Sequence, residues 1–171
     1  MSSMISQSLL PEFDMEMANT RKLLALVPET NGDFRPHPKS MTLSRLAGHV
    51  AEMPMWAAMT LGQDELDMRP NGVRVADAYT FTTQAAALAM FDENLAKARA
   101  MLVDISDADM MRTWSLKRGA QVLMAMPKVA VFRGFVMNHM IHHRAQLGVY
   151  LRMNDVAVPS IYGPSADEGN M

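Results

Sequence analysis

The sequence contains no cysteine among its 171 residues, and this absence removes several kinds of chemistry at once. Without thiols the chain forms no disulfide bond, offers no thiolate to a metal ion and has no cysteine nucleophile. Any thiol that takes part in its chemistry must therefore come from another molecule.

Long hydrophobic runs are also missing. Charged residues or histidines interrupt every apolar stretch well before the roughly 20 residues that a membrane-spanning helix needs. The opening stretch MSSMISQSLLPEF has neither a basic segment nor a long apolar one, so it does not resemble a secretory signal. We therefore expect a cytoplasmic protein without a membrane span.

Clustered positive charge is the third absence. The 16 lysines and arginines are scattered along the chain and the formal net charge is -2, so no basic patch is available to follow a phosphate backbone. Nucleic-acid binding is not expected. The 49% hydrophobic and 20% charged residues are ordinary for a folded protein. We expect one domain over residues 1–171, with residues 158–171 as an extended C-terminal tail.

Methionine, by contrast, is abundant, with 19 residues. A cluster of methionines could form an adaptable surface for varied partners or for a soft metal ion. Here the methionines are spread over every segment, which favours the simpler interpretation that they fill the core in place of leucine.

Hydrophobic periodicity predicts four long helices. The first spans residues 10–27, with Pro11 in its first turn and Pro28 directly after its end. The second begins at Ser40 or Thr42 as N-cap and extends to residue 61. Pro54 lies inside it, and we expect a kink close to His49 rather than a helix end.

The third predicted helix spans residues 84–102 after a threonine cap, and the fourth runs from about residue 127 to 153. Residues 62–82 form a long crossover between the second and third helices. The stretch 104–127 is interpreted as a second long connection, although RTWSLKRGAQVLM could form a short hairpin around residues 117–119. The predicted fold is therefore all-α, a four-helix bundle with long crossover connections.

The chain has five histidines, of which two have the spacing of a chelating pair. His139 and His143 lie four residues apart, so a helix presents both imidazoles on one face. His142 and His143 diverge by about 100° around a helix and cannot both bind one ion. His142 is then a bystander, and His37, between two prolines, is expected to be solvated.

The fourth predicted helix carries one stripe that is apolar at its ends and polar in the middle: Phe132, Phe135, His139, His143, Gln146 and Tyr150. Buried imidazoles in such a stripe need polar partners, and a metal ion is a good one. His49, between apolar neighbours on the second helix, invites the same interpretation. The spacing alone leaves the alternative equally open, namely a hydrogen-bonded core His49 and a partly exposed, pH-sensitive patch on the last helix.

Three segments carry a resemblance to a known family: LSRLAGHVAEMPMWA around His49, NHMIHHRAQLGVYLRMNDVAVP on the last helix, and the terminal IYGPSADE. In their order and spacing they resemble the DinB/YfiT-like proteins. The resemblance implies a four-helix bundle, often a homodimer, with a divalent ion such as zinc, nickel or iron held by His49, His139 and His143. Some relatives use this ion to activate a low-molecular-weight thiol for transfer or isomerisation.

Three nitrogen ligands would leave a coordination position for water or substrate, as in catalytic rather than structural sites. Glu52 could act there as a general base or orient a ligand, and Gln146 could hydrogen-bond a ligand imidazole or a metal-bound water; each could equally be a surface residue. Arg144 could hold a carboxylate of a partner or substrate. Trp56 and Tyr150 could line the pocket.

The function predicted from these residues is a metal-dependent enzyme, either a thiol S-transferase or a hydrolase, acting on a small-molecule substrate. The alternative from another class is a non-catalytic, stress-associated metal-binding protein or dimeric scaffold. A third hypothesis is a helical interaction module that binds no metal.

Overall fold

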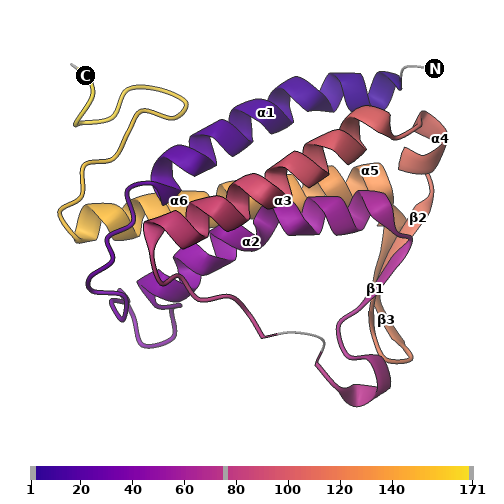
Figure 1. The fold of residues 1–171 in the computed structure, drawn as a ribbon, viewed down its shortest axis with the longest axis horizontal. Helices are drawn as coiled ribbons and strands as arrows, with labels where there is room; N and C mark the ends of the chain where they lie inside the picture. Colours follow the sequence, from indigo (N-terminus) through magenta and orange to yellow (C-terminus); the bar gives the residue numbers. More distant parts are fainter. Residues whose placement is uncertain (1–2, 75–76, 170–171) are drawn as a thin grey trace.

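The computed structural model describes residues 3–74 and 77–169, which form long helices and one small sheet (Figure 1). The long helices are α1 (Met4–Leu24), α2 (Leu43–Gly62), α3 (Gln84–Asp104) and α6 (Asn138–Met153). The strands are β1 (Glu65–Asp67), β2 (Thr113–Arg118) and β3 (Gln121–Pro127). Shorter helical segments are η1 (Pro70–Gly72), α4 (Asp107–Met110), α5 (Lys128–Ala130) and the π-helix η2 (Val131–Met137), which continues into α6.

Side-chain caps fix where two of the predicted helices begin. The hydroxyl of Thr42 accepts the backbone N–H of Arg45 at 3.2 Å, so α2 starts at the second of its two predicted caps. Thr83 caps α3 in the same way. The helix α2 continues past Pro54, so this proline does not end the helix, as predicted.

The predicted start of the first helix is wrong, because α1 begins at Met4 and Pro11 lies inside it. Ser3 caps the helix, and the carboxylate of Asp107 accepts the backbone N–H groups of Met4 and Ile5 at 3.1 and 2.9 Å. The first turn is thus stabilised by a residue that is remote in the sequence, and local periodicity cannot reveal it.

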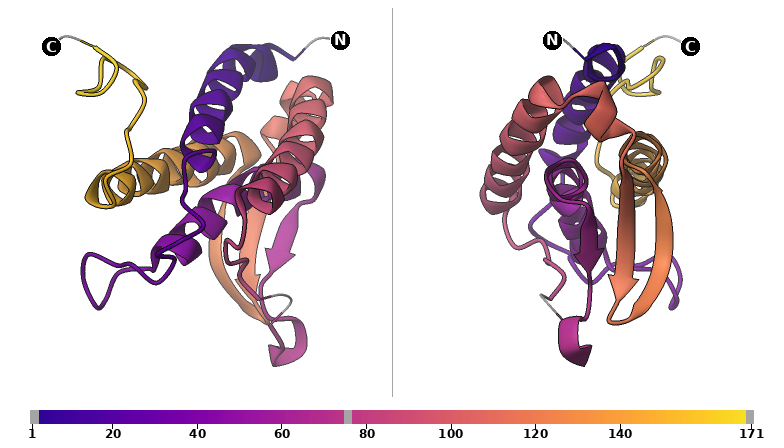
Figure 2. Two further views of the ribbon diagram at one scale, coloured as in Figure 1. Left: turned by 60° about the vertical axis from the view of Figure 1, so that its left-hand side comes forward. Right: turned by 90° about the vertical axis from the view of Figure 1, so that its right-hand side faces the viewer.

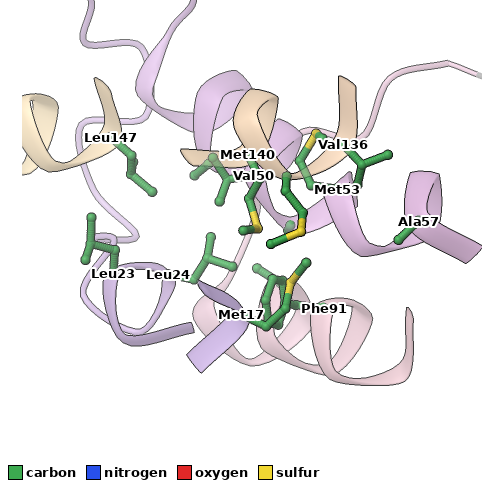
Figure 3. Close-up of a cluster of buried hydrophobic side chains, with 14 of the residues drawn as sticks. Met17, Leu23, Leu24, Val50, Met53, Ala57, Phe91, Val136, Met140 and Leu147 are labelled. Atoms are coloured by element: carbon green, nitrogen blue, oxygen red, sulfur yellow. The ribbon is translucent and has the colours of Figure 1, made fainter. Parts of the chain in front are cut away.

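The long helices pack around one core. Helix α2 lies against α3 and α6, while α1 also packs on α3 and α6. Figure 3 shows part of this core, in which methionines lie beside aliphatic and aromatic side chains. Fully or almost fully buried members include Met17, Leu24, Val50, Met53, Phe91 and Met140. These methionines fill the core as expected.

The sheet corrects the all-α prediction, and the hairpin alternative is confirmed. Strand β2 lies in the middle, parallel to β1 and antiparallel to β3, with Gly119 in the left-handed region at the hairpin turn. The sheet lies at one end of the helices, where α2 ends and α5 begins (Figures 1 and 2). Trp114 and Val131 form a second small core there. The pairing of β1 with β2 spans the whole of α3, so no local signal predicts it.

The C-terminal tail is tied to the helices by its side chains. The hydroxyl of Tyr162 lies 2.7 Å from both carboxylate oxygens of Glu16 and 2.5 Å from the guanidinium of Arg144. Asp167 forms an ion pair with Arg152. These contacts anchor the terminal IYGPSADE segment at Tyr162 and Asp167. Residues 170–171 of the expected tail and 75–76 of the expected crossover lie outside the described residues.

No helix within the described part of the chain is long and apolar enough to cross a membrane.

Candidate metal centre

Three histidines from two helices converge on one point. His49 comes from α2, and His139 and His143 come from successive turns of α6; one ring nitrogen of each lies within 4.8 Å of the others. The ring centroid of His143 lies 4.6 Å from that of each of the other two. All three side chains are partly buried. The predicted convergence is confirmed.

The spacing of the donor atoms fits a divalent ion. Nε2 of His49 lies 3.3 Å from Nε2 of His139. With Zn–N bonds of about 2.0–2.1 Å, tetrahedral geometry places two nitrogen ligands about 3.3–3.4 Å apart. Imidazole is an accepted ligand for zinc, iron and nickel, so this donor set does not select among them.

Burial keeps two of these imidazoles in the form that can bind a metal. Partial burial lowers the pKa of His143 to about 4, although its hydrogen bond to Gln146 opposes this shift. Burial, followed by the charge of His49, also lowers the pKa of His139. Both rings are therefore neutral near pH 7, and each keeps a lone pair for a cation.

Gln146 fixes the tautomer of His143. Its side-chain carbonyl oxygen lies 2.7 Å from Nδ1 of His143. A carbonyl oxygen only accepts hydrogen bonds, so Nδ1 carries the proton and Nε2 is left with the lone pair. Gln146 thus hydrogen-bonds the imidazole of His143, a candidate ligand, which is the contact that one of its two predicted roles requires.

Glu52 lies next to His49 at the candidate metal centre. One oxygen of its carboxylate lies 3.6 Å from Nδ1 of His49, and the other accepts the backbone N–H of Tyr79 at 2.5 Å. Arg45 forms an ion pair with this carboxylate at 3.4 Å and donates to the carbonyl of Tyr79 at 2.9 Å. Burial raises the pKa of Glu52, but its contacts with His49, Tyr79 and Arg45 together outweigh burial and lower the pKa. The carboxylate is therefore ionised and held in place.

Gly48 allows the crossover to reach Glu52. A Cβ at this position would lie 2.4 Å from the carbonyl oxygen of Tyr79 and 2.9 Å from the backbone nitrogen of Phe81. Only glycine permits this close approach, which brings the backbone of Tyr79 against α2. Sequence reasoning missed Gly48, Arg45 and Tyr79; a glycine inside a helix and directly before a candidate ligand was the one available signal.

The π-helix changes the predicted stripe on the last helix. Phe132 packs against Phe13 in the main core, whereas Phe135 lies 5.5 Å from the ring of His139 and 5.9 Å from that of Trp56. The stripe predicted for a regular helix is therefore wrong at this end, because bonding from residue i to i+5 changes the direction of the side chains. The wider turns lie directly before His139, the first candidate ligand on α6, and π-helical segments often occur next to functional sites.

Comparisons with known proteins place the chain in a family. The model of the DinB family matches residues 1–170. The chain belongs to the DinB family. Two crystal structures are similar: a DinB-like protein from Bacillus cereus ATCC 10987 (TM-score 0.68, 22% identity, 91% of this chain and 97% of that chain covered) and the DinB-like protein YjoA from Bacillus subtilis (TM-score 0.67, 16% identity, 92% and 99% covered). At these identities the likeness shows the fold alone. No curated protein matches.

A cavity of about 330 Å³ opens beside His49 of this DinB family protein. His49, Glu52 and Trp56 line it on the α2 side, as predicted for Trp56. Tyr150, also predicted to line a pocket, instead donates its hydroxyl hydrogen to the carbonyl of Met41 at 3.2 Å.

The remaining polar residues of the sequence analysis lie outside the cluster. His142 is exposed and His37 lies in an exposed loop. Arg144 is buried and forms a 2.6 Å ion pair with Glu16. The hypothesis that Arg144 binds a carboxylate of a partner or substrate is corrected, since the carboxylate that it binds belongs to the same chain.

Proposed function

We propose that this DinB family protein is a metal-dependent enzyme, built as a four-helix bundle, whose His49, His139 and His143 hold one divalent ion. The observation that carries the proposal is the convergence of three imidazoles from two helices, with donor nitrogens 3.3 Å apart in the closest pair. A divalent ion bound there lowers the pKa of a coordinated water or thiol and so supplies the nucleophile for hydrolysis or for thiol transfer. We further propose a low-molecular-weight thiol as co-substrate for the transfer reaction; since the chain has no cysteine, that thiol comes from another molecule.

Two of the three proposed ligands each have a neighbouring side chain that orients the imidazole. The side-chain oxygen of Gln146 accepts a hydrogen bond from Nδ1–H of His143 and so directs the opposite nitrogen toward the centre. Glu52 faces Nδ1 of His49 while Arg45 and the backbone of Tyr79 hold its oxygens. With both oxygens engaged, Glu52 is better suited to position His49 than to act as a general base.

Elemental analysis of protein purified without an affinity tag or chelator tests the metal site. We expect about one divalent ion per chain in the wild type and almost none in the His139→Ala variant, since two imidazoles bind far more weakly than three. His142→Ala is the matched control, because it removes an exposed histidine from the same helix and should retain the ion. Circular dichroism should show similar helical content in all three proteins.

Turnover separates the enzyme from a metal-binding scaffold. The metal-loaded protein is assayed with a panel of small thiols and electrophiles, and with ester substrates for hydrolysis. Activity that is lost in His139→Ala and kept in His142→Ala supports the proposal. A retained ion without turnover on any substrate favours the scaffold, and the absence of a stoichiometric ion refutes both.

A further inference from the structure

We propose that the 330 Å³ cavity beside His49 is the substrate pocket and that it takes small, uncharged and largely apolar molecules. The assignment of this cavity as the substrate pocket rests on the proposed metal-dependent activity. The class of ligand is inferred from the lining residues alone. The cavity volume lies at the small end of the range of about 300–1,000 Å³ that is usual for ligand pockets.

One wall of the cavity is a single face of α2. The residues Arg45, His49, Glu52, Trp56 and Met59 follow one another at steps of three and four, so they project from the same side of the helix. The metal ligand and the apolar end of the cavity therefore share one continuous surface. The aromatic contacts from Trp56 to Phe135 and from Phe135 to His139 join the same wall to α6.

Most of the cavity surface is apolar. Trp56 and Met59 of α2 line it together with Leu66 of β1, and two further methionines, Met55 and Met68, belong to the same lining. Methionine side chains are flexible and polarisable, so they adapt to ligands of different shape. We therefore expect the pocket to accept a range of apolar molecules rather than one.

Three of the charged groups of the lining already have partners within the protein. Arg45 and Glu52 form an ion pair with each other. The carboxylate of Asp67 accepts the backbone N–H groups of Arg69 and Gly119 at 2.8 and 2.9 Å. The two remaining charged residues that line the cavity, Arg74 and Asp77, are exposed and opposite in sign. The described lining thus carries two positive and three negative charges, while its apolar part, around Trp56, Met59 and Leu66, has none. An ion entering that apolar part would lose hydration without gaining a partner there.

Calorimetric titration with three probes of the same shape tests the ligand class. The probes are 2-naphthylmethanol, which is neutral, 2-naphthoate, which is anionic, and 2-naphthylmethylamine, which is cationic at pH 7. We expect the neutral probe to bind at least roughly ten-fold more tightly than either charged probe, because the apolar part of the cavity would desolvate both ions without supplying a counter-charge. The titration is done on metal-loaded and on metal-free protein, so that the effect of the metal on probe binding is measured separately from the effect of the cavity.

Two variants locate the binding site. Met55→Glu places a charge at the rim of the cavity on a side chain that is 36% exposed, so the fold should persist. It should weaken binding of the neutral probe by roughly ten-fold or more. Val149→Glu is the matched control, since Val149 is 58% exposed and lines a different apolar cavity of about 450 Å³ under the C-terminal tail.

Each outcome decides the inference. Preference for the neutral probe together with sensitivity to Met55→Glu supports it, in metal-free protein as well. Tighter binding of a charged probe overturns the ligand class, and sensitivity to Val149→Glu instead of Met55→Glu overturns the location. Metal-loaded protein that turns over substrate but binds no neutral probe refutes the inference and leaves the proposed function intact.

Discussion

Replacing Gly48 by alanine should destabilise the protein and weaken its metal site, although alanine is the better helix former. The added Cβ would lie 2.4 Å from the carbonyl oxygen of Tyr79, where ordinary contacts begin at 3.4 Å. The crossover must therefore move by about 1 Å, because a backbone atom cannot rotate away as a flexible side chain does. That movement loosens the hydrogen bond by which Tyr79 holds Glu52 beside His49.

The expected magnitude follows from two opposing effects. Alanine in a helix interior is worth about 1 kcal/mol relative to glycine. Forcing an extra carbon into a packed site costs about 1–3 kcal/mol, and the upper part of that range applies to a backbone contact. We expect the free energy of unfolding to fall by about 1–2 kcal/mol and the affinity for the metal to fall by roughly ten-fold.

Urea denaturation of the metal-free protein measures the first effect, and competition with a chromophoric chelator measures the second. Gly148→Ala in α6 is the matched control, since its Cβ would meet only side-chain atoms at ordinary contact distances, Cδ2 of Leu23 at 3.5 Å and Cγ1 of Val158 at 4.0 Å. That variant should be as stable as the wild type or more so. If Gly48→Ala behaves like Gly148→Ala in both assays, the close approach of the crossover does not position the site.

Three further predictions concern the supports of the site and the tail. Glu52→Gln should weaken metal binding by about 10- to 100-fold in the chelator competition, while helical content stays unchanged; unchanged affinity would show that Glu52 does not position His49. Because folding lowers the pKa of His143 to about 4, the unfolded chain binds more protons below pH 6.5, so stability should fall as the pH drops from about 6.5 toward 4. Urea denaturation of metal-free wild type and His143→Gln should show a weaker pH dependence in the variant, and parallel profiles would contradict the assignment. Tyr162→Phe removes the hydroxyl shared by Glu16 and Arg144, and it should lower the free energy of unfolding by about 1 kcal/mol and speed proteolysis of the tail while leaving the metal content intact; a tail equally resistant to protease would mean that other contacts hold it.

The sequence determined those features that depend on neighbours along the chain. The start of α2 at Thr42 and that of α3 at Thr83 were predictable because a cap hydroxyl bonds to a backbone N–H three residues later. The pairing of His139 with His143 was equally local, since one helical turn separates them. That His49 joins them was implied by the family resemblance rather than by spacing.

Only the tertiary structure decided the features that join remote segments. The early start of α1 depends on Asp107, and the parallel pairing of β1 with β2 closes across α3. The support of His49 depends on Tyr79, which the crossover brings to α2 over Gly48. Hydrophobic periodicity indicates which side of a helix or strand is buried, but it does not indicate which distant residue packs against that side. The three histidines of the candidate metal centre could therefore be named from the sequence and the family resemblance, whereas the groups that hold them, and the cavity beside His49, required the folded chain.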